Sequence, residues 1–176
     1  MGYCSDITRT WVRGHGAAAD AFAALVAGVE ALQGRLCAAV RAGEPFESLH
    51  DNSHREVGAL LRAVGVVRTS GEEAVAKDIT RVFYPHGLGH SLGLQCHDVG
   101  CAVIRPRADN PFLRNTSLIA EGQSFTIEPG VYLPAFGCRS EINVYIDPAQ
   151  GPVVTSVQQD ELVRIAGKPK KDYVLA

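Results

Sequence analysis

Apolar residues in the first half of the chain recur every three or four positions, which is the spacing of amphipathic helices. One such pattern covers residues 17–42, and a second begins near Pro45. A shorter helix is predicted within the sequence "EEAVAKDI", residues 72–79. Ahead of these helices, "YCSDITRTWV" mixes β-branched, aromatic and polar residues and predicts a strand over residues 3–12.

The pattern changes after Phe83, where β-forming residues take over. The stretches "FTIEPGVYL" and "EINVYID" alternate or cluster β-branched and aromatic residues, and Pro and Gly separate them. Between the helices and these strands, "FYPHGLGHSLGLQCHDVG" combines three histidines with four glycines. A continuous helix is costly in so glycine-rich a stretch, so a loop or a bent strand is predicted there.

The composition of the chain indicates its broad class and the kinds of partner that it is not expected to bind. The chain has 176 residues, with 46% hydrophobic and 20% charged residues, as in a globular protein of one domain. No run approaches the roughly 18 apolar residues of a membrane span, so a membrane is not an expected partner. The formal net charge of -2 gives no basic field for a polyanion, so nucleic acid is not expected either. Five cysteines without a CxxC pair, and an N-terminus without a secretory pattern, predict a cytoplasmic location.

Three carboxylates stand in segments that are otherwise typical of buried strands. Glu128 lies in "FTIEPGVY", Glu141 in "CRSEINVYI" and Asp6 in the predicted first strand. A buried carboxylate is costly unless it pairs or binds a cation. Together with His90 they form an oxygen-rich set that suits Mn²⁺, Co²⁺ or Zn²⁺, and the hypothesis is a hydrolytic metal centre.

Each of these carboxylates also has a simpler interpretation. An edge position or a salt bridge would explain Glu128 or Glu141. A local hydrogen bond to Thr8 or Arg9 would explain Asp6.

Three of the other histidines are predicted to have no functional role. His15 beside a glycine turn, and His50 and His54 on the second helix, are expected to face solvent or to cap. His50 and His54 are four residues apart and could bind a metal, but no glutamate stands between them to act as a base, as it does in HExxH.

Four blocks of the sequence, taken in order, resemble a known family. They are "GYCSDITRT", "FYPHGLGHSLGLQCHDVG", "PFLRNTSLIAEGQSFTIEPGVY" and "GCRSE". The resemblance is to the M24 metallopeptidases of the pita-bread (creatinase/methionine aminopeptidase) fold, and within them to the proline dipeptidases. It implies an α+β fold with a curved, mostly antiparallel sheet covered by helices, and metal-dependent hydrolysis of Xaa-Pro dipeptides.

The resemblance also implies a site with two divalent ions, with Mn²⁺ expected first and Co²⁺ or Zn²⁺ as alternatives. Four of the family's five protein ligands fall on residues of this chain. These are Asp6, His90, Glu128 and Glu141.

Further roles follow from the same resemblance. His86 and His97 would bind substrate and move protons, with Glu128 as a proton shuttle and Arg139 supporting the ligands; these four form the predicted catalytic set. Arg114 in "FLRNT" would hold the free carboxylate of a dipeptide.

The chain also departs from the family pattern. The family's first aspartate ligand would fall before Met1, so residues 1–176 are expected to be a single, N-terminally truncated catalytic domain without the usual N-terminal domain. Ser140 places a hydroxyl where relatives pack an aliphatic residue. The alternatives are a non-catalytic creatinase-fold module that binds peptides or proteins, and an Xaa-Pro aminopeptidase acting on longer peptides. The family resemblance also suggests a homodimer.

Overall fold

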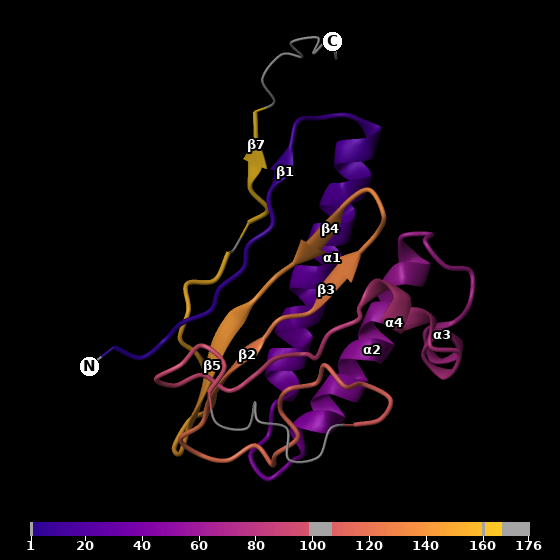
Figure 1. Cartoon of the computed structure of the whole chain (residues 1–176). Coiled ribbons are helices and arrows are strands. Elements are labelled where there is room, and N and C mark those ends of the chain that lie inside the picture. The colour runs from indigo at the N-terminus through magenta and orange to yellow at the C-terminus, as the bar shows by residue number, and fades with distance from the viewer. Residues whose placement is uncertain (1, 99–106, 160, 167–176) are drawn as a thin grey trace, which may run out of the picture.

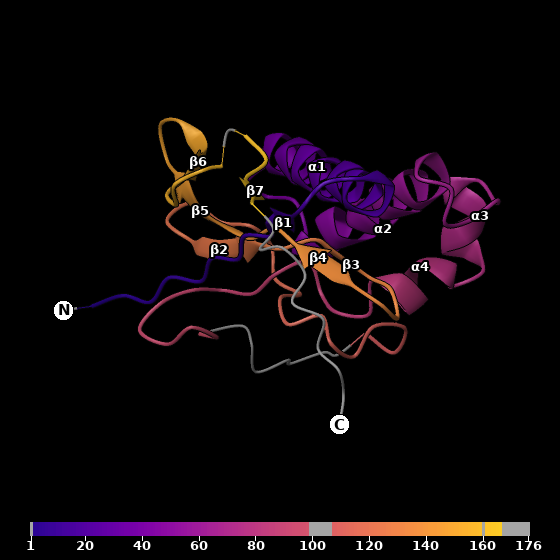
Figure 2. The same ribbon diagram turned by 90° about the horizontal axis from the view of Figure 1, so that it is seen from above.

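The computed structural model describes residues 2–98, 107–159 and 161–166 (Figure 1). Helices lie on one side of a long bent β ribbon, and irregular segments lie on its other side (Figure 2). The helices come early in the chain and most strands come late. The predicted α+β class is therefore confirmed.

Four helices form the first layer. They are α1 (Ala17–Ala39), α2 (Phe46–Ala63), α3 (Gly71–Ala76) and α4 (Ile79–Phe83). α1 packs against α2 and against the ribbon, and α2 begins directly after Pro45, whose fixed φ suits a helix start. The expectation that no stretch approaches a membrane span is wrong for α1, which among the described helices is the one long and apolar enough by length and composition. α1 nevertheless has a buried face like that of a core helix.

The helix predicted within "EEAVAKDI" is divided in two. Ser70 caps α3 by accepting a hydrogen bond from the backbone N–H of Glu73 at 3.1 Å. Asp78 then adopts a left-handed conformation, with φ of 56°, and separates α3 from α4. A left-handed residue cannot continue an α-helix, so the chain turns at this point.

The ribbon is built from β2 (Ser124–Ile127), β3 (Gly130–Tyr132), β4 (Gly137–Arg139) and β5 (Ile142–Asp147). β2 pairs with β5 and β3 pairs with β4, both antiparallel. β6 (Gly151–Val154) adds a third strand beside β5. These strands confirm the prediction for the stretches "FTIEPGVYL" and "EINVYID".

One register runs through the whole ribbon. Ile127 lies opposite Ile142, and Gly130 lies opposite Arg139. The pairing is interrupted between these two positions and resumes without a shift. The residues at the interruption therefore face each other across the ribbon as they would in an unbroken ladder.

A further segment follows the outer edge of β2. The backbone N–H of Thr126 donates to the carbonyl of His90 at 2.9 Å, and that of Glu128 donates to Leu88 at 2.8 Å. Gly89 must be glycine here, because a Cβ would overlap the carbonyl oxygen of Thr126. The stretch is irregular apart from an isolated bridge at Ser91, which agrees with the predicted loop or bent strand.

The strand predicted over residues 3–12 is wrong for most of its length. Only Val12–Arg13 forms a strand, β1, which pairs in parallel with β7 (Arg164–Ile165). Upstream, the segment runs beside β5 with one isolated bridge between Thr8 and Glu141. Side chains take over part of the bonding there, since the Arg9 guanidinium donates to the Glu141 carbonyl at 2.5 Å.

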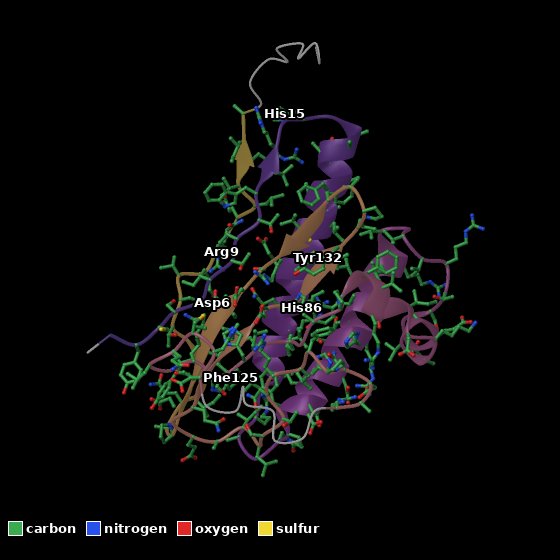
Figure 3. The ribbon with its side chains drawn as sticks, in the orientation of Figure 1. Asp6, Arg9, His15, His86, Phe125 and Tyr132 are labelled. Carbon is green, nitrogen blue, oxygen red and sulfur yellow. The ribbon has the colours of Figure 1, made fainter. Side chains whose placement is uncertain are left out.

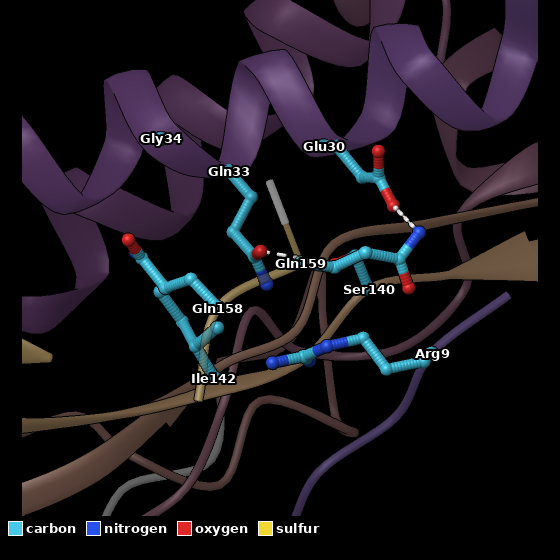
Figure 4. Close-up of a pocket in the computed structure, with 8 residues that line it drawn as sticks. All are labelled: Arg9, Glu30, Gln33, Gly34, Ser140, Ile142, Gln158 and Gln159. Atoms are coloured by element: carbon cyan, nitrogen blue, oxygen red, sulfur yellow. Dashed lines mark hydrogen bonds between the residues drawn. The ribbon is translucent and has the colours of Figure 1, made fainter. Parts of the chain in front are cut away.

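A buried glutamine ties α1 to the interruption in the ribbon. Gln33 donates to the carbonyl of Ile127 at 2.8 Å and accepts from the Ser140 hydroxyl at 3.0 Å. The Ser140 hydroxyl that departs from the family pattern is therefore satisfied. Gln33 and Ser140 also line a cavity of about 140 Å³ on the helix side, together with Arg9 and Glu30 (Figure 4).

Candidate metal centre

The interruption in the ribbon brings two carboxylates together. Glu128 directly follows β2 and Glu141 directly precedes β5, so the common register sets them opposite each other. Both are buried, with exposed fractions of 8% for Glu128 and 1% for Glu141. Two acidic side chains are thereby held side by side away from water.

His90 reaches the same place from the segment beside β2. Its backbone N–H donates to the Thr126 hydroxyl at 3.0 Å, and its ring is 3% exposed. The ring Nδ1 lies 3.2 Å from the carbonyl of Ser91. A carbonyl can only accept, so Nδ1 carries the proton and Nε2 presents a lone pair.

Asp6 reaches this place from the N-terminal segment on the opposite edge (Figure 3). Its backbone N–H donates to the side-chain oxygen of Asn143 in β5 at 3.4 Å. Neither the Thr8 nor the Arg9 hydrogen bond considered for the Asp6 carboxylate is formed among the described residues. Its Oδ2 instead accepts from the Cys96 thiol at 2.9 Å.

These four side chains form a carboxylate cluster around one imidazole nitrogen. His90 Nε2 lies 3.4 Å from Glu128 Oε1, 3.5 Å from Asp6 Oδ2 and 4.0 Å from Glu141 Oε1. Among the described residues, the buried Glu141 Oε1 has no hydrogen-bond partner, whereas its Oε2 accepts from the Thr8 hydroxyl at 2.5 Å. The Thr126 hydroxyl donates to Glu128 Oε1 at 3.2 Å and Cys96 donates to Asp6 Oδ2, so Glu141 Oε1 is the unsatisfied oxygen of the cluster. A cation or a proton among these acceptor atoms would stabilise them, and this donor set suits a divalent ion.

The pKa shifts within the carboxylate cluster agree with a site for a cation. Burial, and then the neighbouring Glu141 carboxylate, raise the pKa of Glu128 to about 8, against the lowering effect of Arg139. Burial likewise raises the pKa of Glu141 and lowers that of His90. Without a bound cation, the charged forms of all these groups are disfavoured.

Arg139 is a weak counter-ion to the cluster. Its guanidinium lies 3.5 Å from Glu128 Oε2 and 4.0 Å from Glu141 Oε2, and the side chain is 40% exposed. Such a partly solvated contact offsets little of the negative charge. Arg139 therefore lies beside the predicted ligands, as expected, but it does not neutralise their charge.

His86 lies apart from these ligands and is held by a residue that sequence reasoning missed. Its Nδ1 donates to the carbonyl of Gly87 and its Nε2 accepts from the Tyr132 hydroxyl, each at 2.8 Å (Figure 3). Burial lowers the pKa of His86, which keeps the ring neutral. The only sequence signal for Tyr132 is its place at the end of the "EPGVY" strand.

The two remaining predicted residues lie on the exposed rim. The His97 ring packs edge-on against that of His90, with centroids 4.2 Å apart. Arg114 is exposed, and its charge contributes to the lowered pKa of both His90 and His97. Both side chains are therefore close to His90 and open to solvent, where a substrate could reach them.

Cys96 also belongs to this site and was not predicted. Its sulfur and one ligand atom each of Asp6, His90 and His97 all lie within 4.8 Å of one another. The hydrogen bond to Asp6 is the main reason that the pKa of the Cys96 thiol is raised to about 12. Its position next to His97 in "QCHD" is the signal that could have found it. Cys101, also noted in the sequence, lies outside the described residues.

The prediction that His50 and His54 face solvent or cap a helix is wrong. They are 0% and 4% exposed, and with Thr80, Tyr84 and Asn110 they form an imidazole cluster under α2. The packing of α3, α4 and Tyr84 over this face of α2 buries them. His15, in contrast, is exposed.

Comparison with known proteins assigns the family. A family model described as metallopeptidase family M24 matches residues 1–148. The chain belongs to metallopeptidase family M24. This family binds divalent metals, and His90 with the two buried glutamates is a possible group to hold them.

Relatives of this M24 chain are named Xaa-Pro dipeptidase. The enzyme of Stenotrophomonas maltophilia is 43% identical over 140 residues and that of Marinobacter nauticus 46% identical over 132 residues. Each match covers 74% of this chain and 30% of the relative. The chain thus spans less than a third of the length of these relatives.

Solved structures confirm the predicted pita-bread fold over about a third of its extent. Pseudomonas aeruginosa aminopeptidase PepP gives a TM-score of 0.70 at 25% identity, covering 86% of this M24 chain and 35% of that chain. A variant of Escherichia coli aminopeptidase P gives a TM-score of 0.71 at 25% identity, covering 86% of this chain and 34% of that chain.

Proposed function

We propose that this chain supplies the metal-binding residues of a hydrolytic site that cleaves Xaa-Pro dipeptides. The observation that carries the proposal is the set of acceptor atoms facing one another around His90 Nε2, with distances of 3.4 to 4.0 Å. The names of the relatives at 43% and 46% identity support the substrate class.

Asp6, His90, Glu128 and Glu141 would hold the metal, with Mn²⁺, Co²⁺ or Zn²⁺ as the candidate ions. Divalent ions at such a site act as Lewis acids and activate water for attack on a carbonyl. Glu128, whose pKa is raised by burial, is suited to accept a proton from the attacking water and return it to the leaving nitrogen.

His86 and His97 would act on the substrate rather than on the metal. His97, on the exposed rim beside His90, would donate to a developing oxyanion. His86 is neutral and its Nε2 already accepts from Tyr132, so it would position Tyr132 and the substrate instead of acting as a free base.

Arg114 is proposed to bind the free carboxylate of the dipeptide. It is exposed close to His90 and His97, and its positive charge contributes to the lowered pKa of both rings. Arg114→Ala should raise KM for dipeptides far more than for tripeptides, because only the dipeptide carboxylate ends at this position. Equal effects would favour an Xaa-Pro aminopeptidase, the reaction class that the solved aminopeptidase P structures support.

Metal content and Gly-Pro hydrolysis, measured on one sample of the 176-residue chain after dialysis against Mn²⁺, test the proposal. We expect bound metal and turnover, and loss of both in Glu141→Gln. Metal without turnover would support the non-catalytic binding module, and absence of metal would contradict the metal centre itself. A cytoplasmic location and a homodimer stay predictions of the sequence.

A further inference from the structure

Cys96 places a thiol within a group of metal-ligating side chains. Its sulfur lies 2.9 Å from Asp6 Oδ2, and the sulfur and a carboxylate oxygen of Asp6 lie within 4.8 Å of ligand nitrogens of His90 and His97. Cys96 is partly buried, whereas Cys4, the other thiol in this region, is exposed and donates to the carbonyl of Leu94 at 3.4 Å. Cys96 is therefore the thiol directed at the site.

This group shares His90 with a second group, formed by His90, Glu128 and Glu141. Within that second group Glu141 Oε1 is buried and unpartnered among the described residues, and it lies 4.0 Å from His90 Nε2. An unpaired buried oxygen aimed at the shared imidazole indicates that a cation belongs between the two groups. The thiol stands on the Asp6 side of that position.

We propose that Cys96 is a metal ligand in this chain: its sulfur joins Asp6 and His90 around a divalent ion, and the site therefore takes Zn²⁺ or Co²⁺ in preference to Mn²⁺. The inference rests on the proposed metal centre and specifies its ligand chemistry. Sulfur is a soft ligand that favours zinc and cobalt, whereas carboxylates alone suit manganese equally well.

To coordinate the ion, the Cys96 thiol must exchange its proton for the metal. The S–H bond breaks, its electron pair stays on sulfur to bind the ion, and the proton leaves to solvent; nothing is oxidised or reduced. Asp6 Oδ2, which accepts the thiol hydrogen in this structure, is then free to bind the same ion.

A simpler role for Cys96 is to orient Asp6 as a hydrogen-bond donor. Cys96→Ser separates the two roles, because a serine hydroxyl keeps the hydrogen bond to Asp6 but lacks a soft sulfur. Cys4→Ser is the matched control, since it removes a thiol from the same N-terminal segment that carries Asp6.

The test is the absorption spectrum of the Co²⁺-loaded 176-residue chain, together with Zn²⁺ and Mn²⁺ affinities from competition with a chelating dye. We expect a sulfur-to-cobalt charge-transfer band in the wild type and in Cys4→Ser but not in Cys96→Ser. Cys96→Ser should weaken Zn²⁺ binding by about 10-fold or more and change Mn²⁺ binding by less than about 3-fold.

The results that would overturn the proposal separate loss of the sulfur ligand from failure of the metal centre. Co²⁺ binding without the band, or a band that persists in Cys96→Ser, would exclude the sulfur ligand and leave the metal centre standing. No binding of any ion would exclude both. In case the variant does not fold, alkylation of Cys96 in the wild type gives a second readout, since Zn²⁺ should protect it and Mn²⁺ should not; equal labelling would also exclude the ligand.

Discussion

The carboxylate cluster and the imidazole cluster are both built on buried histidines, and they have different electrostatic surroundings. In the carboxylate cluster, the lone pair of His90 faces Asp6, Glu128 and Glu141. In the imidazole cluster, His50 and His54 pack edge-on with centroids 4.8 Å apart. Asn110 donates to His50 Nε2 at 2.8 Å, and Thr80 lies 2.9 Å from His54 Nδ1.

The charges near each cluster decide what it can hold. Burial is the main cause that lowers the pKa of His50 to about 3 and that of His54 to about 4. The neighbouring His54 lowers that of His50 further, and Arg81 and Arg107 lower both, against the raising effect of nearby aspartates. A further positive charge is disfavoured there, although His50 Nδ1 and His54 Nε2 have no hydrogen-bond partner among the described residues. Burial of histidines alone therefore does not make a metal site; facing carboxylates do.

The largest expected effect is stabilisation by metal at the carboxylate cluster alone. Zn²⁺ at about 1,000 times its dissociation constant should raise the free energy of unfolding by about 4 kcal/mol. Glu141→Gln should remove most of this gain, whereas His50→Gln should keep it. Urea unfolding with and without Zn²⁺ measures it, and an equal loss in both variants would erase the distinction between the clusters.

The next effect is acid destabilisation from the imidazole cluster. An exposed histidine has an ordinary pKa of 6.5, whereas the folded pKa values of His50 and His54 are about 3 and about 4, so below pH 6.5 only the unfolded chain takes up these protons. Stability should therefore fall by several kcal/mol between pH 6.5 and 3. In urea unfolding with a chelator, His50→Gln with His54→Gln should flatten this fall; an unchanged slope would contradict the assignment.

Glu128 should give the opposite slope in the same experiment with a chelator. Its folded pKa of about 8 lies above the ordinary value of 4.5, so its stabilising contribution is complete below pH 4.5 and is lost as the pH rises through 8. Glu128→Gln should remove this loss of stability between pH 4.5 and 8. Bound metal should remove it as well, because the carboxylate then stays ionised.

A smaller effect is expected at the contact between Gln33 and Ser140, which joins α1 to the ribbon beside both glutamates. Gln33→Leu leaves the Ile127 carbonyl and the Ser140 hydroxyl without their partner, which should cost about 2 kcal/mol. A double-mutant cycle with Ser140→Ala should show a coupling of about 1 kcal/mol. Additive effects would mean that the two side chains do not act together.

The smallest effect is expected for Tyr132→Phe, which keeps the ring but removes the hydroxyl that donates to His86 at 2.8 Å. Stability should fall by about 1 kcal/mol. The pKa of His86, followed by NMR, should rise, because the lost hydrogen bond favoured the neutral ring. Tyr145→Phe in β5 is the matched control, and the same change of pKa in both variants would exclude the direct contact as its cause.

Much of this fold could be predicted from local pattern. The periodic apolar residues of α1 and α2 and the β-branched runs of β2 and β5 follow from side-chain spacing, which short-range geometry sets. The secondary-structure prediction failed where contacts with distant residues replaced regular strand pairing. Residues 3–11 carry a strand-like composition, but side chains of Arg9 and Asn143 take part of their bonding and regular strand pairing is restricted to β1.

The residue types of the carboxylate cluster, and the order in which they come, were determined by the sequence itself. Only the tertiary structure decided that His50 and His54 are buried, that Cys96 meets Asp6, and that Gln33 satisfies Ser140. In each case a side chain either contacts a partner from a distant segment of the chain or is buried beneath such a segment. Local spacing carries no information about which segments meet, because that choice depends on how the helices and the ribbon bury their apolar faces together.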